Sequence, residues 1–222
     1  MNFGIFGWRR LCLSYTYCCA MNTKALARIL SPSRVEFSLG YERADAARAI
    51  SMIDAAVLIP IYRSQEGEVH IVMILRNPGG VHGGQIAFPG GKHDPGDETM
   101  LDTALREVRE ELGLVVDRND VLAELPTQQT RTSGYRVFPY LARIRVPERW
   151  QIAEREIAEI VDVRLGDLTR PDSHDRMIDR FPTWQRAEQV SFYRIGEHRL
   201  WGLSYRILQP VISRLVAGEW DV

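Results

Sequence analysis

Apolar residues occur along the chain in short runs with strand-like composition, separated by polar turns. The runs at residues 55–62 and 69–75 flank the turn Gln65-Glu66-Gly67, and this arrangement predicts a β-hairpin. Residues 77–96 are so rich in glycine and proline that we expect a loop there, interrupted by one short strand. The pattern places that short strand at residues 85–88. It predicts four further strands at residues 121–125, 135–144, 157–163 and 190–195.

Two segments have the hydrophobic spacing of helices. In residues 98–112 the apolar positions, including Leu105, Val108 and Leu112, fall on one face, and Gly113 follows as a helix stop. Residues 200–216 predict a closing amphipathic helix. With strands before and after the central helix and a second helix at the end, we expect an α/β protein with a mixed sheet and helices on both faces.

Composition narrows the class of protein. At 222 residues, with 45% hydrophobic and 26% charged residues, the chain fits one soluble domain with an appendage, and this excludes disordered, collagen-like and coiled-coil proteins. No apolar run is long enough for a membrane helix, and a formal charge of -1 argues against non-specific binding to nucleic acid or anionic lipid. We therefore expect a small-molecule partner, no nucleic acid and no membrane, while the oligomeric state stays open and allows a homodimer.

The first residues differ from the rest of the chain. Residues 1–35 contain five basic and no acidic residues, as in organelle transit peptides, and all three cysteines lie within the first 20. The alternative is that translation starts at Met21, so that residues 1–20 are absent from the mature protein. We interpret residues 1–50 as a leader and 51–222 as the domain. A domain without cysteines indicates a reducing compartment, either the cytoplasm or an organelle to which residues 1–20 direct the chain.

Acidic residues are concentrated around the central predicted helix. Residues 91–124 hold ten acids and four bases, in a protein that is almost neutral overall. On a helix, Glu107, Glu110 and Glu111 project from one flank, where their charges repel one another unless a cation lies among them. Hard cations such as Mg²⁺ are bound by carboxylate, water and phosphate oxygens. The alternative is an ordinary solvated helix face on which Arg106 pairs with Glu110.

The segment from Gly91 to Leu114 resembles the Nudix box, G-x5-E-x7-R-E-U-x-E-E-x-G-U. Every fixed residue type is present, but six residues instead of five separate Gly91 from Glu98. Either Asp97 or Glu98 therefore takes the first acidic position, and we favour Glu98 because it keeps the spacing to Arg106. The resemblance implies a Nudix-like α/β/α sandwich, a divalent cofactor (Mg²⁺ or Mn²⁺) and a hydrolase acting on phosphoanhydride bonds. It implies these metal ligands: Glu107, Glu110, Glu111 and the carbonyl of Gly90 or Gly91.

The same resemblance implies further roles. Glu98 and Arg106 would hold the loop against the helix, so the implied catalytic set is Glu98, Arg106, Glu107, Glu110 and Glu111. A carboxylate must also accept a proton from the attacking water. The candidates are a box glutamate not fully committed to metal, Glu156 and Glu159.

Segments outside the box resemble the coenzyme A diphosphatase branch of the family: residues 85–91, 133–140 and 198–208. This implies hydrolysis of coenzyme A to 3′,5′-ADP and 4′-phosphopantetheine. The implied contacts with the nucleotide-type substrate come from Arg76, Gln85, Arg131 and Tyr135, with Arg136 as a further phosphate contact.

The upstream signature of that branch is incomplete. Asn77 stands where the signature has a small residue, and the segment Gly79-Gly80-Val81 stands where the signature has its second arginine. Another nucleoside diphosphate derivative, such as ADP-ribose or a dinucleotide, is the alternative substrate, and a non-enzymatic nucleotide sensor is the third hypothesis. We interpret Trp201 and Tyr205, four residues apart on the predicted last helix, as core residues.

Overall fold

The computed structural model describes residues 52–79, 82–130, 133–179 and 186–222. The chain divides into two units, Met1–Ala49 and Ile50–Val222, and all the described elements belong to the second. The leader predicted at residues 1–50 lies outside the described residues. So does Arg131.

The central element is a mixed eight-stranded sheet built around strand β1 (Ile53–Arg63). Strand β2 (Val69–Arg76) pairs with β1 antiparallel, through the predicted hairpin, and β7 (Tyr135–Arg143) pairs with β1 in parallel. The other strands are β3 (Ile86–Ala87), β4 (Gly90–Lys92), β5 (Val121–Glu124), β6 (Gln128–Gln129) and β8 (Ile157–Arg164). A single-turn 3-10 helix, Arg118–Asp120, leads into β5.

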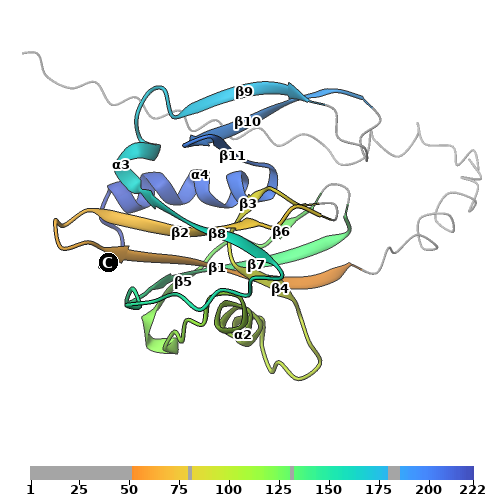
Figure 1. Cartoon of the computed structure of the whole chain (residues 1–222), viewed down its shortest axis with the longest axis vertical. Coiled ribbons are helices and arrows are strands. Elements are labelled where there is room, and N and C mark those ends of the chain that lie inside the picture. Colours follow the sequence, from red (N-terminus) through yellow and green to blue (C-terminus); the bar gives the residue numbers. More distant parts are fainter. Residues whose placement is uncertain (1–51, 80–81, 131–132, 180–185) are drawn as a thin grey trace, which may run out of the picture. The chain divides into compact units, whose positions relative to one another are not determined.

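Both faces of this sheet are covered by helices, which confirms the predicted α/β arrangement (Figure 1). In β1, Ala56 and Leu58 pack into the cluster under helix α2 (Met100–Leu112). The alternate residues Ile59 and Ile61 pack into a second cluster with helix α4 (Gly202–Val216). Successive side chains of a strand point to opposite faces, so one strand supplies both cores.

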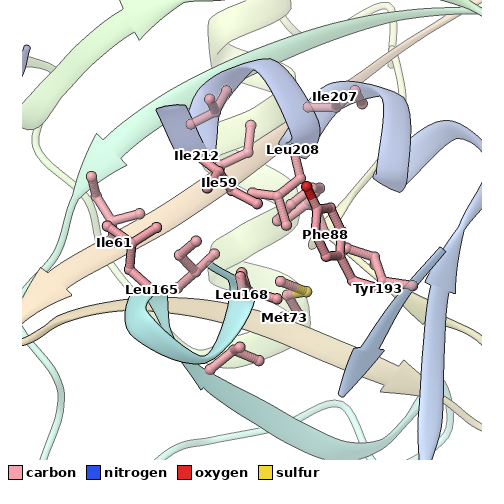
Figure 2. Close-up of a cluster of buried hydrophobic side chains, with 14 of the residues drawn as sticks. Ile59, Ile61, Met73, Phe88, Leu165, Leu168, Tyr193, Ile207, Leu208 and Ile212 are labelled. Carbon is pink, nitrogen blue, oxygen red and sulfur yellow. The ribbon is translucent and has the colours of Figure 1, made fainter. Parts of the chain in front are cut away.

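Figure 2 shows the cluster on the α4 side. Ile59 and Met73 from the sheet meet Ile207 and Leu208 from α4, while the short helix α3 (Leu165–Leu168) closes one edge. Burying one such side chain stabilises the fold by about 1.5–3 kcal/mol. This face of the sheet therefore anchors the C-terminal helix.

A second, three-stranded antiparallel sheet was only partly predicted. It consists of β9 (His174–Asp179), β10 (Glu188–Ile195) and β11 (His198–Trp201). The helix predicted from residue 200 begins at Gly202 instead, because the backbone of Trp201 is extended and in register with Phe192 of β10. Trp201 thus lies in β11 and not on a helix with Tyr205, which corrects that placement, while Tyr205 packs partly buried against the α4-side cluster, as the core interpretation expects.

Helix α2 begins two residues later than residue 98. The hydroxyl of Thr99 accepts a hydrogen bond from the Asp102 amide, and the Asp102 carboxylate accepts one from the Thr99 amide. This capping box fixes the start of the helix at Met100 and leaves Glu98 outside it. The helix ends, as predicted, at Gly113. Among the described residues, no helix has the length and apolar character needed to cross a membrane.

Candidate active site

Strand β4 brings main-chain atoms directly beside the acidic flank of α2. Gly91 lies so close to Glu107 that a Cβ atom added to it would be 2.4 Å from the carboxyl carbon. The amide of Gly90 donates a hydrogen bond to Oε2 of Glu111 at 2.9 Å. A residue with a side chain at position 91 would displace the Glu107 carboxylate. The glycine is therefore required for the contact between strand and helix.

Arg106 connects the loop, the strand and the helix. Its Nε and Nη2 donate to the two carboxylate oxygens of Asp97, each at 3.0 Å. Its Nη1 donates to Glu107 Oε1 at 2.9 Å and Glu110 Oε2 at 3.1 Å, and Nη2 also donates to the Lys92 carbonyl at 3.0 Å. Of the two candidates for the first acidic position, Asp97 contacts Arg106, and the favoured Glu98 does not. The capping box directs Glu98 to solvent, and Asp97 forms the pair.

A chain of hydrogen bonds that we did not predict supports Asp97. Thr103 Oγ1 donates to Asp97 Oδ2 at 2.8 Å, and His93 Nδ1 lies 2.9 Å from the same hydroxyl. Because the hydroxyl proton is used toward the carboxylate, His93 Nδ1–H is the donor in the second bond. The hydrogen bonds from Arg106, followed by the bond from Thr103, hold the pKa of Asp97 well below its usual range.

The three box glutamates differ in burial. Glu111 is almost fully buried. The side chain of Glu107 is 17% exposed and that of Glu110 is 55% exposed. Burial raises the pKa of Glu111 to about 7, and the charges of Glu107 and Glu156 add to this rise. Burial also raises the pKa of Glu107. Burial thus disfavours the bare charges of Glu107 and Glu111, which favours a cation beside them, whereas Glu110 is solvated.

In the described part of the chain, no three His, Cys, Asp or Glu side chains are placed to hold a metal ion. The guanidinium of Arg106 forms ion pairs with both Glu107 and Glu110, but its single positive charge is also paired with Asp97 and does not offset all three carboxylates. Arg76 provides a second positive charge, with Nη1 3.8 Å from Glu111 Oε1. The site thus combines the predicted carboxylates with two arginines.

The predicted substrate contacts are distributed around this site. Arg76, a third exposed, lies against Glu111, and its amide is bonded to the carbonyl of Gln85 at 3.1 Å. Tyr135 begins β7 and lies under the ammonium group of Lys92. Arg136 instead forms a bidentate pair with Asp54, with both distances 2.7 Å. That pair occupies the N–H edge of the guanidinium with which an arginine binds oxyanions.

The two candidate bases lie in different places. The amide of Asn77 donates to the Glu156 carbonyl at 2.8 Å, and its side chain donates to the Glu154 carbonyl at 2.7 Å. These bonds hold Glu156 near the box, where its charge raises the pKa of Glu107 and Glu111. Glu159 is in register with Leu75, which packs on the α4 side. Paired residues of a sheet share a face, so Glu159 points away from α2.

Comparison with known proteins identifies relatives. The family model for the NUDIX domain matches residues 52–184. The chain is 31% identical over 176 residues to the human protein named mitochondrial coenzyme A diphosphatase NUDT8, covering 75% of this chain and 71% of the relative. It is 30% identical over 166 residues to the uncharacterized Nudix hydrolase NudL of Photorhabdus laumondii, covering 72% and 84%.

One solved structure resembles the fold. It is the MutT/nudix family protein from Enterococcus faecalis, with a TM-score of 0.52 and 18% identity. The alignment covers 80% of this chain and 68% of that chain. At this identity the likeness concerns the fold alone.

Proposed function

Because the chain belongs to the Nudix family, whose members hydrolyse phosphoanhydride bonds, we propose that it cleaves the diphosphate linkage of coenzyme A or its derivatives. The products would be 3′,5′-ADP and 4′-phosphopantetheine. The identity to a human coenzyme A diphosphatase and the residues shared with that branch support this substrate. The observation that carries the proposed chemistry is the contact of the Gly90-Gly91 backbone with the carboxylates of Glu107 and Glu111.

Nudix hydrolases generally need a divalent cation, and we propose Mg²⁺ or Mn²⁺ here. Glu107, Glu110, Glu111 and the Gly91 carbonyl would hold it, which requires the carboxylates to move together from the positions described above. Their chemistry fits a hard cation, since all four offer oxygen atoms and burial disfavours the bare charge of Glu107 and Glu111. A bound divalent ion neutralises phosphate charge and lowers the pKa of attacking water.

The side chains around the carboxylates would have distinct tasks. Arg106, fixed by Asp97, sets the positions of Glu107 and Glu110. Arg76, next to Glu111, is placed to bind an oxygen of the diphosphate, for which an arginine fork is well suited. We favour Glu156 over Glu159 as the acceptor of the water proton, because Glu159 points to the opposite face. A box glutamate not fully committed to metal is the other candidate.

A substrate panel tests the proposal. Purified protein with Mg²⁺ or Mn²⁺ is assayed on coenzyme A, ADP-ribose and a dinucleotide, with Glu111→Gln as the inactive control. Release of 3′,5′-ADP from coenzyme A is the expected result. The signature's second arginine is absent from the segment Gly79-Gly80-Val81. This absence favours the alternative substrate, another nucleoside diphosphate derivative. Hydrolysis of those substrates without 3′,5′-ADP release would select it, and binding without any hydrolysis would select the sensor.

For cell location we propose the cytoplasm, with direction to an organelle by residues 1–20 as the alternative. The human relative is named as a mitochondrial protein. A fluorescent reporter fused to residues 1–50 is compared with one that starts at Met21. Diffuse signal from both supports the cytoplasm, whereas organelle signal from the longer fusion alone supports the alternative.

A further inference from the structure

Strand β4 presents different chemistry on its two faces. Gly91 lies against the Glu107 carboxylate on the α2 side. Lys92 is the next residue of the strand, so its side chain points to the opposite face. Its register partner in β1 is Ala55. A charged side chain is thus placed one residue from the carboxylate site but on the other side of the sheet.

The ammonium group of Lys92 rests on an aromatic ring. Its Nζ lies 5.8 Å from the centroid of Tyr135, which begins β7 on the far side of β1. Ala55 lies between the strands that carry these two residues, and its single methyl group leaves room for them to meet. A ring attracts a cation and fixes its position, yet it leaves the positive charge uncompensated. The ammonium N–H groups stay available to an anion.

Unlike Lys92, two arginines of this region form ion pairs with carboxylates. Arg106 is paired with Asp97, Glu107 and Glu110, and Arg136 is paired with Asp54. Among the described residues, no carboxylate forms an ion pair with Lys92. The side chain is exposed on the surface next to a strongly acidic loop. A substrate anion next to that loop would be repelled unless an uncompensated cation such as Lys92 received it.

We propose that Lys92 is a specificity-determining residue that binds the 3′-phosphate of coenzyme A. The proposal rests on the proposed function, in which the diphosphate lies at Glu107, Glu110 and Glu111. Because Lys92 is on the opposite face of β4 from Gly91, the anion that it binds is a group beyond the diphosphate. Coenzyme A carries such a group on its ribose, whereas dephospho-coenzyme A and ADP-ribose lack it. Lysine is a suitable phosphate ligand as a point charge.

The test compares Lys92→Met with wild type on coenzyme A and on dephospho-coenzyme A. We expect KM for coenzyme A to rise roughly tenfold at an unchanged kcat, which is the size expected for loss of one charged hydrogen bond. The constants for dephospho-coenzyme A stay the same, and Lys92→Arg keeps the preference. Arg199→Met is the matched control, because Arg199 lies over the Phe192 ring at 5.2 Å in the other sheet. An unchanged preference, or an equal loss on both substrates, overturns the proposal.

Product binding gives a second readout that does not depend on turnover. By calorimetry, wild type is expected to bind 3′,5′-ADP more tightly than 5′-AMP, with an advantage that decreases as salt screens the charge. Lys92→Met is expected to lose that advantage. If wild type releases no 3′,5′-ADP from coenzyme A, the proposed function fails whatever Lys92 does. If it does release 3′,5′-ADP while Lys92→Met still prefers the bisphosphate, only the role of Lys92 fails.

Discussion

Helices α2 and α4 cover opposite faces of the same sheet, but they are built differently. Helix α2 has a capping box at its start and a left-handed glycine at its end, and it buries the carboxylate of Glu111 together with its apolar residues. Helix α4 has no side-chain cap at its start and contains Pro210. All the residues it buries are apolar: Ile207, Leu208, Val211, Ile212 and Leu215.

The difference supports placing the proposed chemistry on α2 and not on α4. Burying a carboxylate disfavours its charged form, so a helix selected for stability alone would place an apolar residue at position 111. Here the carboxylate is retained and positioned by the Gly90 amide and by Arg76. A shifted pKa in a buried acid beside other charges is typical of functional sites. Helix α4 buries no such group, and apolar packing together with hydrogen bonds made by Arg206 and Tyr205 holds it in place.

The change with the largest expected effect is Glu111→Gln. We expect kcat to fall by about 10²–10³-fold, the range for losing one group that stabilises transition-state charge. The fold should keep its stability, because Gln accepts the same bond from Gly90 and burial already disfavours the charge of Glu111. Steady-state kinetics and a thermal melt measure the two effects. Wild-type turnover in this variant would remove Glu111 from the catalytic set.

The second change, Asp97→Asn, tests whether Asp97 or its neighbour Glu98 holds Arg106 in place. An amide cannot accept the paired bonds of Arg106 as a carboxylate does, so Arg106 loses its anchor. We expect about a 10–100-fold loss of activity, as for residues that orient metal ligands. The matched control is Glu98→Gln, whose side chain is exposed and which should retain wild-type activity. The opposite ranking of the two variants would restore Glu98 to the box.

Asp97 also has a pH signature. Because Arg106 lowers its pKa in the folded protein, the pair contributes stability above the ordinary value of 3.8 and loses it as the pH falls through the lower folded value. Unfolding free energies measured between neutral and acidic pH should therefore fall less steeply in Asp97→Asn than in wild type. Parallel curves would show that the pair does not stabilise the fold.

The smallest change concerns α4. Ile212→Val removes one buried methylene and should lower the unfolding free energy by about 0.5–1.5 kcal/mol. Because no proposed catalytic group lies on α4, kcat of the folded protein should stay the same. Urea unfolding and kinetics on one sample give both values. A loss of kcat without a loss of stability would mean that α4 contributes to the reaction as well as to the fold.

Local patterns in the sequence were enough to predict the central helix and the mixed sheet, while the metal-binding role of the box glutamates stays a prediction. Local patterns were not enough to choose between Asp97 and Glu98, because that choice depends on where the Thr99 capping box starts the helix. The second sheet was also incompletely predicted. Strand β9 is mostly exposed and lacks the alternation that marks a half-buried strand, so only its pairing with β10 identifies it. The contact between His93 and Thr103 likewise depends on the fold of the loop.

Gly90 adopts a φ of 149° and lies where a Cβ atom would be 2.3 Å from the Ala56 carbonyl. Any other amino acid there would push the two strands apart and break the amide contact with Glu111. At this point main-chain atoms hold the strand against the carboxylate of Glu111, and substitution of side chains can hardly alter that contact. Engineering a new ligand preference should therefore leave residues 90 and 91 untouched and randomise the outward-pointing positions next to them, beginning with Lys92.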